Sequence, residues 1–112
     1  MKIHTRTVGD VHVLDISGQI ILGEATKTIR HTISDLLVNG GNKIVLNLKD
    51  VNYVDSSGIG ELVRTYTTVT TEGKQLKLLN LTRKIRELLV ITKLLTVFEV
   101  YENEKAALAS FA

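Results

Sequence analysis

The sequence contains no cysteine, no proline and no tryptophan. The lack of cysteine excludes disulfide bonds, thiolate metal ligands and cysteine nucleophiles. Aromatic residues make up only 4% of the 112 residues, which leaves few platforms for stacking on single-stranded nucleic acid. The net charge is only +2, and basic and acidic residues are interspersed rather than gathered in a stripe. We therefore expect no direct contact with nucleic acid.

Long apolar runs are missing too. No stretch approaches the length that spans a membrane, and residues 1–7 lack the apolar core of a secretory signal. We therefore expect a cytoplasmic protein without membrane insertion. An apolar content of 44% is sufficient for a folded core, and the length suits one domain, residues 1–112.

Apolar periodicity predicts alternating strands and helices. The expected strands are 2–8, 11–17, 44–48, 76–79 and 97–100, and the expected helices are 24–38, from the serines at 56–57 to about 72, after Thr82, and about 103–111. Gly9-Asp10 suits a tight hairpin turn, and Gly18 is expected to end the second strand. Single helices between the later strands imply parallel neighbours. The predicted fold class is therefore α/β, with a mixed sheet, an antiparallel opening hairpin and about four packed helices in the order ββαβαβαβα.

Residues 51–60 carry most of the polar chemistry, between a buried strand and an amphipathic helix. This segment includes Asp55, Ser56, Ser57, Gly58 and Gly60. The start of a helix leaves backbone N–H groups unpaired, favours Ser or Asp as a cap and attracts anions, including phosphate. We expect at least one serine to lie near the surface at the helix start. The two glycines are expected to permit close approach of the backbone, either to neighbouring strands or to a partner.

Other chemistries fit this sequence less well. The histidines at 4, 12 and 31 lack metal-ligand spacing, so no metal site is expected. No histidine follows the serines, and the first glycine of a nucleophile elbow is missing, which argues against a hydrolase. Gly58-Ile59-Gly60 is a weak phosphate-loop pattern, so a small nucleotide-binding protein stays open as an alternative. The basic run at 83–86 is either a solvated face or a surface that contacts an acidic patch.

The run Asp55-Ser56-Ser57-Gly58-Ile59-Gly60, after Asn47-Leu48-Lys49-Asp50-Val51, resembles the STAS domain pattern, and most closely that of bacterial anti-sigma-factor antagonists. The resemblance extends to residues 14–18, 73–80, 85–89 and 94–98. It implies a regulator that is not an enzyme and needs no cofactor. Its implied partners are an anti-sigma factor with serine kinase activity, which phosphorylates Ser56, and a serine phosphatase. The unmodified form would bind the anti-sigma factor and free the sigma factor, and phosphorylation would block this binding.

Several points of this resemblance are open. Ser57 either caps the helix or is a second phosphate acceptor. Many family members carry an acidic residue where this chain has Ile21, so residues 20–22 either form an apolar docking patch or are buried under the first helix. The residues expected to bind the partner are Asp55, Ser56, Ser57, Gly58, Ile21, Leu22 and Glu24. The alternative within the family is a regulatory subunit of a membrane lipid transporter or of a stress-signalling assembly.

Overall fold

The computed structural model describes residues 1–111. The elements are β1 (Lys2–Val8), β2 (Val11–Ile20), α1 (Glu24–Val38), β3 (Lys43–Val54), α2 (Ser56–Thr71), β4 (Gln75–Leu79), α3 (Arg83–Ile91), the short 3-10 helix η1 (Leu95–Val97), β5 (Val100–Tyr101) and α4 (Glu104–Ala109). The strands form one sheet in the order β1-β2-β3-β4-β5, with β1 antiparallel to β2 and all other neighbours parallel. The predicted α/β class, opening hairpin and element order are confirmed.

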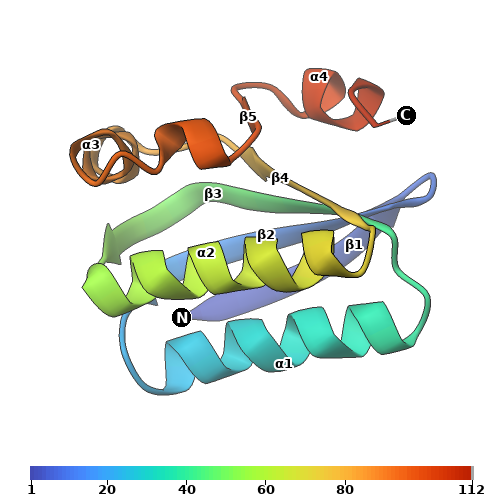
Figure 1. Cartoon of the computed structure of the whole chain (residues 1–112), viewed down its shortest axis with the longest axis horizontal. Coiled ribbons are helices and arrows are strands. Elements are labelled where there is room, and N and C mark those ends of the chain that lie inside the picture. Colours follow the sequence, from blue (N-terminus) through green and yellow to red (C-terminus); the bar gives the residue numbers. More distant parts are fainter. Residues whose placement is uncertain (112) are drawn as a thin grey trace.

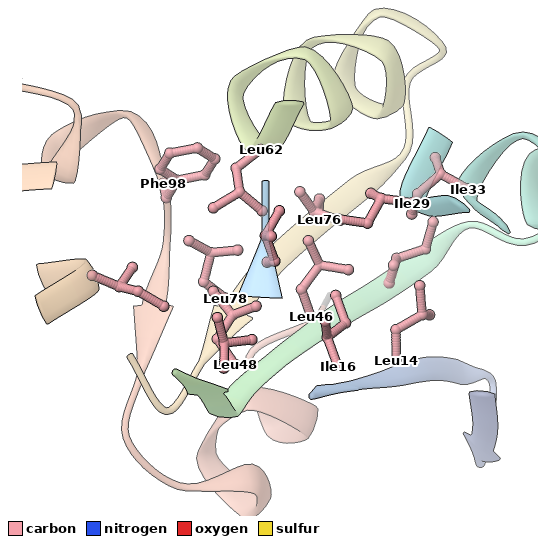
Figure 2. Close-up of a cluster of buried hydrophobic side chains, with 14 of the residues drawn as sticks. Leu14, Ile16, Ile29, Ile33, Leu46, Leu48, Leu62, Leu76, Leu78 and Phe98 are labelled. Carbon is pink, nitrogen blue, oxygen red and sulfur yellow. The ribbon is translucent and has the colours of Figure 1, made fainter. Parts of the chain in front are cut away.

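Helices lie on both faces of this sheet (Figure 1). α1 and α2 lie side by side on one face, and α3 contributes to the same core, whereas α4 packs on the opposite face. Figure 2 shows Leu14, Leu46 and Leu78 among the side chains of the first core. Val13 and Val45, their neighbours in the chain, belong to the second core beneath α4. Successive strand residues therefore serve opposite faces, which explains why these strands read as continuous apolar runs.

Charged side chains tie α4 to the sheet. Arg6 Nε donates a hydrogen bond to Asp15 Oδ2 at 2.7 Å, and the terminal nitrogens of Arg6 bond to Glu104 in the first turn of α4. The hydrogen bonds from Arg6 lower the pKa of Asp15 and of Glu104 below their ordinary values, and they raise the pKa of Arg6. Asn47 donates a further bond to Asp15 at 2.8 Å.

A buried lysine lies on the same face. Lys77, only 3% exposed, places its Nζ 4.6 Å from the ring centre of Phe111 and 5.5 Å from that of Tyr101. The ammonium group also donates to the carbonyl of Ser110 at 3.1 Å and lies 3.4 Å from Glu99. A buried ammonium requires such partners, so Lys77 joins β4 to the segment that follows α4.

Two strands are longer than the sequence predicts. β2 continues through Gly18, its predicted end, to Ile20, and β3 continues past Leu48 to Val54. The two extensions pair with each other, Gly18 with Val51 and Ile20 with Val54, across shifts in register. Gly18 has a φ of 93°, a conformation that suits an irregular strand. Here the glycine shifts the register and does not end the strand.

The predicted strand at 97–100 is also displaced. β5 begins at Val100, and the residues before it include η1. Phe98 is buried in the first core (Figure 2). Its ring meets the ring of Tyr66 edge-on, with the two ring centroids 5.3 Å apart. Backbone pairing with β4 starts only at Glu99, whose carbonyl accepts from the N–H of Leu78 at 2.9 Å. The core contact of Phe98 therefore precedes the strand and is not part of it.

The helix predictions differ from the structure mainly at the ends. α1 has its predicted bounds, and Thr82 caps α3 by accepting from the N–H of Ile85 at 3.3 Å. The last helix is shorter than predicted, because Asn103 caps it and it ends at Ala109. Ala107 is buried against the sheet as expected.

Candidate functional site

The candidate site is the junction between β3 and α2, residues 55–58, called the serine corner below. Asp55 has an extended backbone, and its Oδ1 accepts from the N–H of Gly58 at 2.7 Å, so Asp55 is the N-cap of α2. Its Oδ2 accepts from the N–H of Leu22 at 3.1 Å. One carboxylate thus starts the helix and holds the loop between β2 and α1 beside it. The prediction that Ser57 caps the helix is wrong.

The two serines follow Asp55 in the first turn of α2. Ser56 is exposed, as expected for at least one serine, and Ser57 is half-buried. Within residues 1–111, no hydrogen bond engages either hydroxyl, whereas both oxygens of Asp55 are bonded. N–H groups in the first turn have no partner inside the helix, so an acceptor group on Ser56 would meet unpaired donors. Ser56 is therefore the accessible hydroxyl of the corner.

The glycines of the corner have different surroundings. A Cβ at Gly58 would lie 2.2 Å from the carbonyl oxygen of Ile20 and 2.7 Å from Val54 Cγ1, so the start of α2 packs directly on the end of β2. The predicted close approach is confirmed at Gly58. Gly58 is also buried, which argues against the expected direct contact with a partner. At Gly60 nothing lies within 4 Å of a Cβ, so no neighbouring strand approaches it closely, and close approach of a partner there stays a prediction.

Within residues 20–22, one side chain is buried and the other two are exposed as a docking patch would require. Ile20 is fully buried, whereas Ile21 is 36% exposed and Leu22 is 73% exposed. Glu24 is exposed in the first turn of α1. Because Leu22 is hydrogen-bonded to Asp55, this exposed apolar surface is continuous with the serine corner.

On its other side the serine corner borders a groove of about 530 Å³ between the end of β3 and α3. The lining residues are Asn52, Tyr53, Val54, Asp55, Ser56, Thr82, Lys84, Ile85, Glu87, Leu88 and Ile91. Tyr53 is 49% exposed and Ile91 is 77% exposed, so large apolar surfaces flank the groove. Sequence reasoning missed this groove. The spacing of Lys84, Leu88 and Ile91 on one face of α3 was the available signal, but nothing local pairs that face with residues 52–56.

The basic run on α3 is partly engaged. Arg83 bonds to Glu87 at 3.1 Å, and Arg86 bonds to Glu102 at 3.3 Å. Lys84 has no ion pair within residues 1–111 and lines the groove. The two arginines fit the interpretation as a solvated face, and Lys84 is the member of the run that is available for an anion.

The histidines lie apart from the corner. His4 and His12 are on the opening hairpin, and His31 is exposed on α1. Across the part of the chain that the structure describes, no group of three or more His, Asp or Glu side chains could hold a metal ion. Among the helices of residues 1–111, none is long and apolar enough to cross a membrane.

Known proteins are similar to this chain in sequence and in fold. The STAS domain family model matches residues 2–107. The anti-sigma-B factor antagonist of Bacillus subtilis (strain 168) is 34% identical over 91 residues, 81% of this chain and 81% of that protein. An anti-sigma factor antagonist from Mycobacterium paratuberculosis has a similar structure, with a TM-score of 0.82, 20% identity, and coverage of 97% of this chain and 92% of that one. The Bacillus cell fate determinant SpoIIAA, in its phosphorylated form, gives a TM-score of 0.75 at 21% identity, covering 96% of this chain and 97% of that one. The chain described here belongs to the STAS domain family.

Proposed function

We propose that this protein is an anti-sigma factor antagonist that works by partner switching. Its unmodified form binds an anti-sigma factor that is also a serine kinase, and this binding frees the sigma factor. The observation that carries the proposal is the Ser56 hydroxyl, exposed and without a hydrogen bond within residues 1–111 at the start of α2. The role of the Bacillus subtilis relative, an anti-sigma-B factor antagonist, supports it.

The proposed modification is the transfer of one phosphoryl group to Ser56. The hydroxyl oxygen attacks the γ-phosphorus of ATP held by the kinase, and the bond from that phosphorus to the β,γ-bridging oxygen breaks. ADP leaves, and the hydroxyl proton passes to a base of the kinase. A serine phosphatase restores the hydroxyl by attack of water on the phosphorus, which releases inorganic phosphate. This chain supplies only the acceptor, so it is a substrate and not an enzyme.

The phosphate would change binding more than folding. It adds about −1.5 to −2 charges beside Asp55, and the positive end of α2 offsets part of this at the surface. A partner that covers the corner must remove the phosphate from water, which costs several kcal/mol, and a loss of about 2.7 kcal/mol corresponds to about 100-fold in affinity. The phosphorylated protein therefore stays folded and loses its partner.

The proposed docking surface is the exposed part of the predicted set. Ser56 and the half-buried Ser57 lie at its centre, and Ile21, Leu22 and Glu24 extend it to the start of α1. Asp55 and Gly58 hold the corner in shape, because both oxygens of Asp55 are bonded and Gly58 is buried.

Incubation with a candidate kinase and ATP, followed by mass spectrometry, tests the acceptor. We expect one phosphate on Ser56, which Ser57→Ala retains and Ser56→Ala abolishes. In binding assays with the anti-sigma factor, Ser56→Ala should still bind and Ser56→Asp should bind about 100-fold more weakly. Ser34→Asp, the same substitution at an exposed position of α1, is the control.

Loss of binding in Ser56→Ala with full binding in Ser56→Asp would contradict the proposal. An unmodified protein held in a stable transporter complex would instead favour the regulatory-subunit alternative, and intrinsic turnover of ATP or GTP would favour the nucleotide-binding alternative.

A further inference from the structure

The groove between the serine corner and α3 contains one charged side chain that has no partner within residues 1–111. Four charged side chains lie in or beside it: Asp55, Lys84 and Glu87 in its lining, and Arg83, which bonds to Glu87. Asp55 is occupied by the N–H groups of Gly58 and Leu22. Lys84 alone among these four has neither an ion pair nor a side-chain hydrogen bond within residues 1–111.

Lys84 also shares this groove with Ser56. Both residues line the same groove, Ser56 from the first turn of α2 and Lys84 from the first turn of α3. Both side chains are exposed, so neither must leave a packed position to meet the other. A flexible lysine with an ammonium group that has no partner is a suitable counter-ion for a phosphate.

We propose that Lys84 binds the phosphate carried by Ser56, so that the phosphorylated residue turns into the groove rather than into solvent. This inference rests on the proposed modification of Ser56 and names the residue that receives it. Asp55 and Glu87 would repel the phosphate, although Arg83 pairs with Glu87, and Lys84 supplies the attraction on this side of the groove. The paired phosphate would lie beside Tyr53 and Ile91, the exposed apolar side chains that flank the groove. Phosphorylation would then cover part of the apolar surface that flanks the groove and would also add negative charge to it.

The test is a 31P NMR pH titration of the full chain with phosphoserine incorporated genetically at position 56. The second pKa of a phosphoserine is ordinarily about 6, and a nearby cation lowers it because it stabilises the dianion. We expect Lys84→Gln to raise this pKa by about half a unit, the size typical of an exposed ion pair. Lys84→Arg, which keeps the positive charge, should keep the lower value.

Lys105→Gln is the matched control, because it removes one exposed positive charge from α4 on the opposite face of the sheet. An unchanged pKa in Lys84→Gln would overturn the inference, and so would an equal rise in both glutamine variants. Circular dichroism of each variant verifies that it is folded. The titration contains neither kinase nor anti-sigma factor, so its failure is distinct from a failure of the partner switching tested with the Ser56 variants.

Discussion

The serine corner and the face beneath α4 use polar side chains in opposite ways. Beneath α4, Arg6 holds both Asp15 and Glu104, and Lys77 is enclosed by aromatic rings and bonded to Ser110. At the corner only the capping Asp55 is bonded. Polar groups that stabilise a fold must be partnered, because an unpaired buried group costs free energy. Groups that are left free at the surface are available to other molecules.

The same difference distinguishes residues that determine the stability of the fold from residues that are available to bind a partner. Substitutions beneath α4 should change the free energy of unfolding and its dependence on pH. At the corner the effect depends on whether the residue builds the turn, as Gly58 does, or projects from it, as Leu22 does.

The largest effect is expected from Gly58→Ala. A methyl group at this position would lie 2.2 Å from the carbonyl oxygen of Ile20, and backbone cannot yield as a flexible side chain does. We expect a loss of about 3 kcal/mol in the free energy of unfolding, measured by urea denaturation. Gly60→Ala is the control, because its methyl group meets nothing within 4 Å, and it should stabilise α2 by about 0.5–1 kcal/mol. Similar losses in both variants would show that the close packing on Ile20 is not the cause.

A smaller effect is expected from Arg6→Ala. This change removes the hydrogen bonds to Asp15 and Glu104 that join β1, β2 and α4. The carboxylate side chains are 29% and 37% exposed, so water weakens each pair, and we expect a loss of about 1 kcal/mol at pH 7. Arg64→Ala, on the exposed face of α2, should change stability by less than about 0.5 kcal/mol. Equal losses would assign the effect to general charge and not to this network.

The same variant predicts the pH dependence. Arg6 lowers the pKa of Asp15 and of Glu104 in the folded protein, so its contribution is fully present above their unfolded values of about 4. As the pH falls through the lower folded values, both carboxylates become protonated and the contribution disappears. Thermal melting between pH 7 and pH 2 should therefore show a difference between wild type and Arg6→Ala that shrinks below about pH 4. A difference that stays constant across this range would contradict the assignment.

The smallest effect on stability is expected from Leu22→Asp. Leu22 is 73% exposed, so the free energy of unfolding should change by less than about 0.5 kcal/mol. Its affinity for the anti-sigma factor should fall about tenfold, because an apolar contact becomes a desolvated charge. Val38→Asp changes an equally apolar residue, 82% exposed, at the far end of α1 and should bind normally. Normal binding by Leu22→Asp would remove residues 21–22 from the docking surface.

Local patterns were sufficient to predict much of the fold. The stripe of Ile29 and Ile33 predicts α1, Gly9-Asp10 predicts the hairpin turn, and Thr82 predicts the start of α3, and all of them are confirmed. Each depends on residues within a few positions of one another. The prediction that at least one serine lies near the surface at the start of a helix is also confirmed, by Ser56, because it follows from the same local rules.

Predictions failed where distant segments decide the outcome. The end of β3 at Val54 depends on its pairing with Ile20, a residue of another strand. Asp55 can cap α2 because its backbone is extended, and it is extended because it directly follows the last residue of β3. Phe98 packs against Tyr66 before β5 begins, although an apolar run reads as a strand there.

The sequence by itself therefore determined the order of strands and helices, the faces they bury and the serine at the start of α2. Periodicity and capping are short-range properties that any chain with these residues would carry. Only the tertiary structure decided that β3 continues to Val54 beside Ile20, and that Lys84 shares a groove with Ser56. Sheet pairing brings residues more than twenty positions apart into contact, and no local pattern encodes which exposed side chains then face each other.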